Sequence, residues 1–159
     1  MIEHDPIHEL GYGDPGAGKT EFASTFPKPL LVFQFDPYGK DTPYLRRGVS
    51  KEFTFDNLGT PIRQIMSRKT GALLIQIEYF HDTNWVMDVK GQGANQTTIP
   101  TAHVDPECWE RFGKRMYYFN PEEYDQWATV VFDSITTMEI AARAFFQYRL
   151  NPSAKDGRQ

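Results

Sequence analysis

Two stretches of the chain are apolar over the length of a β-strand, with almost no interruption by polar residues. They are residues 29–36, PLLVFQFD, and residues 128–134, ATVVFDS. Such runs are typical of strands that are buried on both faces of a parallel sheet. Residues 135–150 show a long helical pattern instead. The pattern therefore predicts an α/β architecture.

The N-terminal region predicts a strand, a glycine-rich loop and a helix in succession. Residues 7–13, IHELGYG, are read as a short strand that runs into the loop. Residues 19–26, KTEFASTF, are read as the helix that follows, ended by Pro27. Together with the strand at 29–36, these elements predict a βαβ unit.

The middle of the chain changes character. Short β-type runs at 52–55, 60–66 and 72–80, the last two joined by the turn SRKTG, predict a β-hairpin or small meander. Residues 82–104 are polar and contain glycine, and we expect a mobile loop there. Residues 105–119 predict a helix in which three large apolar side chains share a face. These side chains are Trp109, Phe112 and Met116.

The predicted elements assemble into one domain over residues 1–159. Its core lies at 7–40 and 120–150, and the hairpin and loop form an insertion at about 41–119. Only three core strands are recognisable, which implies an exposed sheet edge. Three explanations stay open: a reading frame truncated at its C-terminus, a fragment, or a meander that extends the sheet.

Composition excludes several classes of protein. The chain has 159 residues, of which 40% are hydrophobic and 24% charged, and no apolar run approaches a membrane span. The N-terminus lacks the basic start and apolar stretch of a secretion signal, and a single cysteine, Cys108, fits a reducing compartment. The formal net charge of -4 argues against a wholly basic nucleic-acid coat. We expect a cytoplasmic protein without a membrane partner.

Residues 13–20, GDPGAGKT, contain the clearest chemical signal. Their spacing, G-x-x-x-x-G-K-T, is that of a phosphate-cradling loop between a strand and a helix. Glycines allow backbone N–H groups to approach a triphosphate, Lys19 reaches its β- and γ-phosphates, and the Thr20 hydroxyl is a ligand for Mg²⁺. The expected ATP-binding residues are Gly13, Asp14, Pro15, Gly16, Ala17, Gly18, Lys19 and Thr20.

Two carboxylates follow the apolar strands. Asp133 ends the strand at 128–134, at the strand end where ligands of α/β sheets bind. We expect it to coordinate Mg²⁺ directly or to contact a group that coordinates Mg²⁺. The alternative is that Asp133 or Ser134 caps the next helix. Asp36 ends the strand at 29–36 and suits a base or water-positioning group, although DPYG is also a good turn sequence. The expected catalytic residues are Lys19, Asp36 and Asp133.

Other polar residues are weaker candidates. Basic side chains that can contact nucleic-acid phosphates or a neighbouring subunit occur in three groups, for which a solvated surface is the ordinary explanation: Arg46 and Arg47, Arg68 and Lys69, and Arg111, Lys114 and Arg115. Trp85 is either a base-stacking residue or a buried anchor. The pairs with weak metal-binding potential are His4 with His8, His81 with Asp82, and His103 with Cys108.

These motifs resemble the RecA-like branch of P-loop ATPases, in which the catalytic acid lies after the strand that follows the loop helix. Many ATPases of the AAA class have a glutamate directly after the metal aspartate, where this chain has Ser134. Residues 7–40 and 120–150 resemble phage-encoded RecA-like nucleotide-binding ATPases, some of which assist single-strand annealing and recombination. The resemblance implies a RecA-like parallel sheet flanked by helices and a place in the host-cell cytoplasm. It also implies a metal role for Asp133, a possible γ-phosphate sensor at Ser134 and a catalytic acid at Asp36, where RecA has glutamate.

Three functions remain open at this level. The first is a Mg-ATP-dependent ATPase that assembles as a homo-oligomer on single-stranded DNA, with a basic residue supplied by a neighbour. The second is a nucleotide or small-molecule kinase, with residues 82–104 as its lid. The third is a non-catalytic ATP-binding assembly module, which the aspartate at position 36 favours.

Overall fold

The computed structural model describes residues 8–14, 17–36, 41–82, 85–90, 97–103 and 106–149. The helices are α1 (Lys19–Ala23), α2 (Thr42–Leu45), α3 (Cys108–Tyr117), α4 (Pro121–Tyr124) and α5 (Ile135–Arg149). The strands are β1 (Leu30–Gln34), β2 (Val49–Ser50), β3 (Thr54–Phe55), β4 (Pro61–Met66), β5 (Leu73–Tyr79), β6 (Trp85–Lys90), β7 (Thr97–His103) and β8 (Thr129–Asp133). Among these residues, none of the helices combines the length and the apolar character that a membrane crossing requires.

The main sheet is mixed. Its strand order is β2–β4–β5–β1–β8, and β3 also pairs with β4. Strand β1 runs parallel to β5 on one side and to β8 on the other, while β4 is antiparallel to β5. The predicted meander is therefore confirmed, and it extends the parallel part of the sheet through β5.

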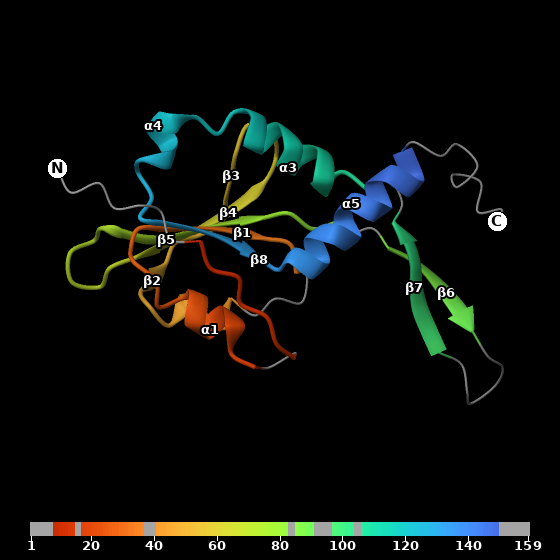
Figure 1. Cartoon of the computed structure of the whole chain (residues 1–159), viewed down its shortest axis with the longest axis horizontal. Helices are drawn as coiled ribbons and strands as arrows, with labels where there is room; N and C mark the ends of the chain where they lie inside the picture. The colour runs from red at the N-terminus through yellow and green to blue at the C-terminus, as the bar shows by residue number, and fades with distance from the viewer. Residues whose placement is uncertain are drawn as a thin grey trace.

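The two faces of β1 contribute to two separate apolar clusters. Leu30 and Val32 pack with Tyr44 of α2 on one face, and Leu31 and Phe33 pack with Phe112 of α3 on the other. All five residues of β1 are buried, as its continuous apolar pattern predicts. Figure 1 shows α1 on one side of the sheet and α3 and α4 on the other. The α/β class, with helices flanking a partly parallel sheet, is confirmed.

A buried ion network fastens α3 and α4 to the sheet. The Arg115 guanidinium donates to both carboxylate oxygens of Glu78, at 2.8 and 3.0 Å, and also to Glu123. The exposed fraction is 12% for the Arg115 side chain and 1% for that of Glu78. A carboxylate with so little contact to water is stable only when a cation or several donors face it. Arg115 thus holds α3 at a fixed position over β5.

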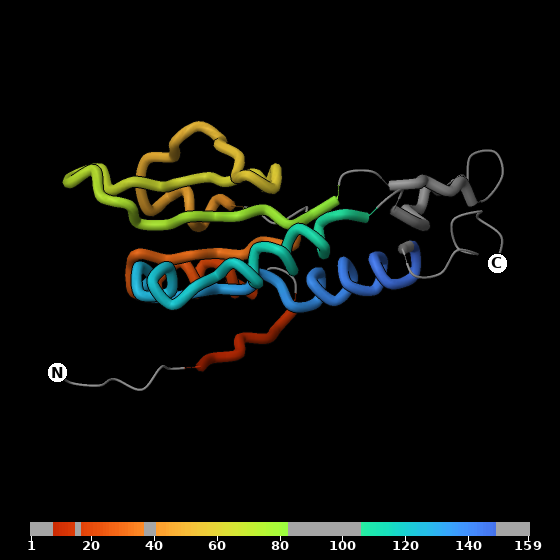
Figure 2. Tube along the Cα trace, turned by 90° about the horizontal axis from the view of Figure 1, so that it is seen from above, coloured from red at the N-terminus to blue at the C-terminus, as the bar shows by residue number. Residues whose placement is uncertain are grey.

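One predicted element in the N-terminal region is wrong, and another is shorter than predicted. Residues 8–13 form no strand, and Figure 2 shows this red segment leading away from the sheet. With two glycines and several polar residues in IHELGYG, the segment has little apolar surface to bury: Leu10 and Tyr12 are 71% and 92% exposed. The predicted βαβ unit therefore lacks its first strand among the described residues, and the predicted helix at 19–26 ends early, at Ala23.

The segment 82–104 was expected to be a loop, but it contains a second, two-stranded sheet. Strands β6 and β7 pair in antiparallel fashion, and Figure 1 shows them set apart from the main sheet. Their sequences, WVMDVK and TTIPTAH, are rich in β-branched residues, which favour strands even in a polar context. The overall polarity of the segment concealed this local preference.

Candidate nucleotide-binding site

The centre of the candidate site is a contact between α1 and β8. The Thr20 hydroxyl donates a hydrogen bond of 3.0 Å to Oδ2 of Asp133. Thr20 lies in the first turn of α1, and Asp133 is the last residue of β8. Because β1, β5 and β8 are parallel, their carboxyl ends meet at one edge of the sheet. The loop residues and Asp133, which the sequence predicted to cooperate, are therefore adjacent at that edge.

The glycine-rich loop is held by its own lysine. The Lys19 amine donates to the carbonyl oxygens of Gly13 at 2.6 Å and Asp14 at 2.9 Å. Gly18, at the N-terminus of α1, has φ +82°, a left-handed conformation that a side chain makes costly. Pro15 and Gly16, two of the predicted nucleotide-binding residues, lie outside the described residues, and Ala17 is exposed at the start of the turn before α1.

A residue that the sequence did not indicate also contacts Asp133. Tyr44 of α2 is fully buried, and its hydroxyl donates to Oδ2 of Asp133 at 3.3 Å. Tyr44 comes from a segment rich in turn residues, DPYGKDTPYLRRG, which carries no sequence signal for a site. Two hydroxyl groups thus converge on one carboxylate oxygen, one from α1 and one from α2.

The electrostatic environment of Asp133 favours a cation. Burial raises the pKa of the Asp133 carboxyl, while the hydrogen bonds from Thr20 and Tyr44 oppose that rise. The nearby carboxylate of Asp36 raises this pKa further, and Lys19 lowers it. A bound cation would offset both the burial and the repulsion by Asp36. The structure therefore fits a cation at Asp133 on electrostatic grounds.

The donors present suit Mg²⁺ held jointly with a nucleotide. No group of three or more His, Cys, Asp or Glu side chains that could hold a metal occurs in the part of the chain that the structure describes. Mg²⁺ typically uses one or two protein oxygens and completes its shell with phosphate oxygens and water. Thr20 and Asp133 provide such a pair.

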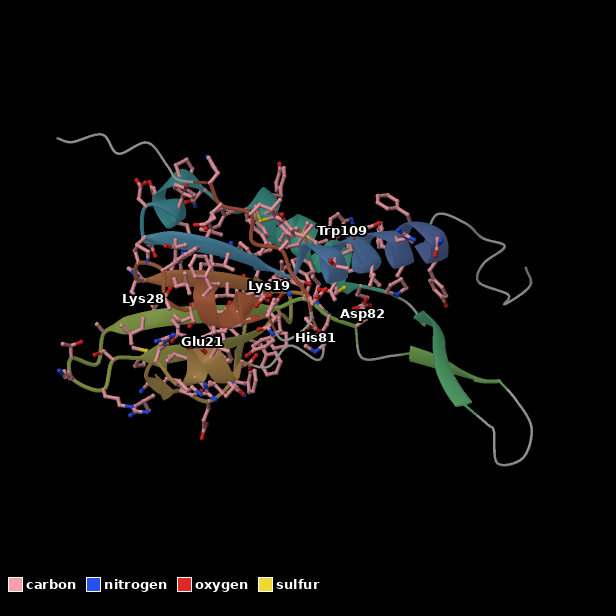
Figure 3. All side chains as sticks on the ribbon, turned by 60° about the horizontal axis from the view of Figure 1, so that its bottom comes forward. Lys19, Glu21, Lys28, His81, Asp82 and Trp109 are labelled. Atoms are coloured by element: carbon pink, nitrogen blue, oxygen red, sulfur yellow. The ribbon has the colours of Figure 1, made fainter. Side chains whose placement is uncertain are left out.

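Asp36 lies at the same sheet edge, two residues after the end of β1. Its charge acts on Asp133 and also on His81, which follows β5, so it lies within electrostatic range of both. Burial, followed by the positive charge of Arg111, lowers the pKa of His81. Figure 3 shows Lys19 at the same end of the sheet as His81 and Asp82, with Lys28 toward the other end. The three predicted catalytic residues are thus placed at one edge.

Ser134 and Asp82 act as helix caps in the structure. The Ser134 hydroxyl accepts a hydrogen bond of 3.4 Å from the Thr137 amide in the first turn of α5, as the capping alternative proposed. Asp82 accepts from the amides of Glu107 and Cys108 at the start of α3. The sequence had considered Asp82 only as a weak metal ligand beside His81.

The predicted basic groups are largely engaged within the protein. Arg115 is buried against Glu78, Arg111 lies 3.9 Å from Glu107, and Arg47 binds Glu21. Lys114 also pairs with Glu110, at 2.8 Å, so each cation of the group Arg111, Lys114 and Arg115 faces a carboxylate. Contact of this group with nucleic acid stays a prediction. The spacing of these charges on one helix suggested a basic cluster. In the structure Arg115 contacts Glu78 of β5, and Arg111 lies near Glu107 at the N-cap of α3.

Comparison with known proteins agrees with this geometry. A family model described as an AAA domain matches residues 6–153 of the chain. The chain belongs to this AAA domain family. Comparison with curated proteins and with solved structures gave no match. AAA domains are in general nucleotide-binding ATPases, which accounts for the loop at 13–20 and for its position against Asp133.

Membership of the AAA domain family bears on the sequence resemblance in two ways. It confirms the general part, membership of an AAA, P-loop ATPase-type family. The narrower part, a phage-encoded RecA-like protein, stays a prediction. The AAA match runs through the meander and the β6–β7 sheet as well as the predicted core, because it extends from residue 6 to residue 153.

Proposed function

We propose that this AAA domain binds Mg-ATP at residues 13–20 and hydrolyses it to ADP and phosphate. The observation that carries the proposal is the 3.0 Å contact between Thr20 and Asp133. It joins a hydroxyl from the first turn after the phosphate loop to a carboxylate from a distant strand, and this pair supports a shared Mg²⁺ site of the kind found in P-loop NTPases. Family membership supports nucleotide binding independently of this geometry.

Each side chain at the edge has a definite task in this proposal. Lys19, which donates to two loop carbonyls in the structure, turns to the β- and γ-phosphates when a nucleotide occupies the loop. Thr20 and Asp133 would hold Mg²⁺, which would neutralise charge on the phosphate oxygens. Asp36 orients the attacking water and accepts its proton. Ser134, which caps α5, would sense the γ-phosphate, a role that the RecA-like resemblance implies.

For the wider role, we propose ATP-driven assembly of a homo-oligomer that handles single-stranded DNA in annealing, recombination or replication. The support is the resemblance of residues 7–40 and 120–150 to phage RecA-like proteins. A neighbouring subunit would supply a basic residue to the γ-phosphate. Among the described basic side chains, Arg46 and Arg143 are 70% and 65% exposed and so can reach a neighbour.

The test measures binding and turnover separately. Calorimetry should detect Mg-ATP binding by the intact chain, and phosphate release should be faster with single-stranded DNA than without it. Asp133→Asn should weaken Mg-ATP binding, while Asp125→Asn, on the exposed surface after α4, should leave it unchanged. If the wild-type chain binds no Mg-ATP, the proposed function is wrong. If it hydrolyses ATP without any response to DNA, only the wider role is wrong.

A non-catalytic module remains a second candidate because of one feature of the chain. Asp36 is one methylene shorter than the glutamate at this position in RecA, so it reaches less far toward the γ-phosphate. In that case Mg-ATP would bind and change the assembly without being turned over. The kinase alternative relied on a loop at 82–104 that acts as a lid. The structure has strands β6 and β7 in that segment, so no observation on the described residues favours the kinase over the other two functions.

A further inference from the structure

Helix α2 is connected to three other elements by polar side chains. Tyr44 donates to Asp133 at the end of β8, at 3.3 Å. Asp41, immediately before α2, accepts hydrogen bonds from Tyr79 of β5 and from Arg63 of β4. The short helix is therefore attached to the candidate magnesium site at one point and to the meander at another.

Arg47, two residues after the end of α2, completes the attachment on the side of the phosphate loop. The Arg47 guanidinium donates to the Ser24 hydroxyl at 2.8 and 3.0 Å and to the Glu21 carboxylate at 2.7 Å. Ser24 is fully buried at the end of α1. Because α1 carries Thr20, the same segment braces both the helix that bears the hydroxyl ligand and the strand that bears the carboxylate.

The environment of Tyr44 allows little freedom to its ring. The side chain is fully buried and packs in the cluster that contains Val32, Ile65 and Ile77. A buried phenol hydroxyl normally has a hydrogen-bond partner. Burying a carboxylate acceptor at an apolar face costs free energy, so its presence there indicates a function for the carboxylate itself. With Thr20 and Tyr44 both donating to Oδ2, rotation of the Asp133 carboxylate is restricted.

We propose that Tyr44 is a positioning residue for magnesium binding: its hydroxyl orients the carboxylate of Asp133 against Thr20. This inference rests on the proposed function, because it assumes that Asp133 and Thr20 hold Mg²⁺ beside a nucleotide. Groups that orient a metal ligand through a hydrogen bond typically contribute 10- to 100-fold to metal affinity. Tyr44 acts through Asp133 and does not touch the nucleotide.

The first experiment compares Tyr44→Phe with the wild type by calorimetry, titrating Mg²⁺ at a fixed ATP concentration. Tyr44→Phe removes the hydroxyl and keeps the ring in its apolar cluster. We expect the half-saturating Mg²⁺ concentration to rise about 10-fold, with little change in the weak binding of ATP in EDTA. An unchanged Mg²⁺ requirement in Tyr44→Phe would overturn the proposal.

Tyr79→Phe is the matched control. It also removes a buried phenol hydroxyl that donates to a carboxylate, but the acceptor is Asp41, which keeps its contact with Arg63. Both variants should lower the thermal unfolding temperature, because both remove a buried hydrogen bond. Only Tyr44→Phe should change the Mg²⁺ requirement. An equal change in both variants would mean that any buried hydroxyl on this face has the effect, and the positioning role would be rejected.

A double-mutant cycle shows whether Tyr44 acts through Asp133. In an Asp133→Asn background, Tyr44→Phe should have no further effect on the Mg²⁺ requirement, since the carboxylate that it orients is gone. Additive effects would contradict the proposal. If the wild type shows no Mg-ATP binding at all, the proposed function and this inference both fall. If the wild type binds and depends on Asp133 but not on Tyr44, only this inference falls.

A second measurement needs no variant and covers the case in which Tyr44→Phe does not fold. Hydrogen exchange of the backbone amides in α2 should be slower with Mg-ATP than with ATP and EDTA, because a fixed Asp133 holds Tyr44 in place. Amides at the exposed hairpin turn 67–71 serve as the internal reference. Equal exchange in α2 under both conditions would overturn the proposal.

Discussion

The Thr20 hydroxyl donates to the Asp133 carboxylate across 113 positions of sequence. Thr20 lies in the first turn of α1, after the phosphate loop, and Asp133 ends β8 near the centre of the second predicted core segment. The contact joins the two halves of the site at the carboxyl edge of the parallel strands. It also explains why the carboxylate is tolerated there, since hydroxyl donors offset part of its burial.

Lys19→Ala should weaken Mg-ATP binding by about 100-fold as measured by calorimetry, because it removes the charge that pairs with the phosphates. The variant should remain folded, because the hydrogen bonds that Lys19 donates to the Gly13 and Asp14 carbonyls are exposed. Lys69→Ala, on the exposed turn between β4 and β5, is the control and should bind normally. Normal binding by Lys19→Ala would contradict the assignment of the loop.

Asp36→Asn separates the two candidate functions. If Asp36 orients the attacking water, the variant should keep its Mg-ATP affinity within about 3-fold. Its hydrolysis rate should fall by about 100-fold or more, which is the usual contribution of a general base to the rate. Asparagine preserves the shape of the side chain and removes its charge. Phosphate release and calorimetry on the same preparation give both values. Unchanged hydrolysis would exclude Asp36 as the base, and a wild type without turnover would favour the non-catalytic module.

Arg115→Ala should destabilise the fold strongly. The substitution leaves the Glu78 carboxylate, 1% exposed, without its main partner, which typically costs about 3–5 kcal/mol. The free energy of unfolding in urea measures this loss. Arg143→Ala is the comparison, since Arg143 and Glu139 are 65% and 63% exposed and such pairs contribute about 1 kcal/mol or less. Similar losses in the two variants would contradict the buried network.

The free energy of unfolding should decrease as the pH is lowered, because protonation of His81 is less favourable in the folded protein than in the unfolded chain. Burial and then Arg111 lower its pKa, whereas Asp82, Asp41 and Asp36 oppose the shift, and the net direction is below the ordinary value of 6.5. Between the folded and the unfolded pKa, the unfolded chain therefore binds the extra proton. The stability associated with neutral His81 is complete above pH 6.5 and is lost as the pH falls through the folded pKa.

His81→Asn isolates this contribution. The free energy of unfolding, measured in urea from about pH 7.5 to 5, should fall less steeply in the variant than in the wild type. The carboxylates titrate in both proteins and cancel in the comparison. Parallel profiles would show that the environment of His81 does not penalise its protonation.

Two glycines should respond to alanine in opposite directions. At Gly48 an added Cβ would lie 2.2 Å from the carbonyl oxygen of Met66, so Gly48→Ala should destabilise the protein by about 3 kcal/mol. At Gly113, inside α3, nothing lies within 4 Å of an added Cβ, and Gly113→Ala should stabilise by about 0.5–1 kcal/mol. Thermal and urea unfolding of both variants test the pair. A change of stability in the same direction in both variants would contradict the contacts of Gly48 and Gly113 in the structure.

Sequence by itself determined the features that depend on local chemistry. The spacing of Gly13, Gly18, Lys19 and Thr20 identifies a phosphate loop without reference to any other part of the chain. The run at β1 predicts a buried parallel strand, and Trp109, Phe112 and Met116 predict the apolar face of α3, both of which the structure has. The run at β8 also forms a parallel strand, but the prediction that it is buried is wrong: β8 lies at an edge of the described sheet, and Phe132 is 41% exposed. Each of these sequence signals lies within a single loop, strand or helix, so it can be recognised without knowledge of the rest of the fold.

Only the tertiary structure decided which distant segments meet. Strand β5 joins β1, residues 8–13 stay outside the sheet, and residues 82–104 contain a sheet of their own. Tyr44 reaches Asp133 and Arg115 reaches Glu78 although neither pair has a sequence signature. The physical reason is that strand pairing and the satisfaction of buried polar groups depend on partners that are far apart along the chain. A local pattern states that a group must be buried or paired, but the packed fold selects its partner.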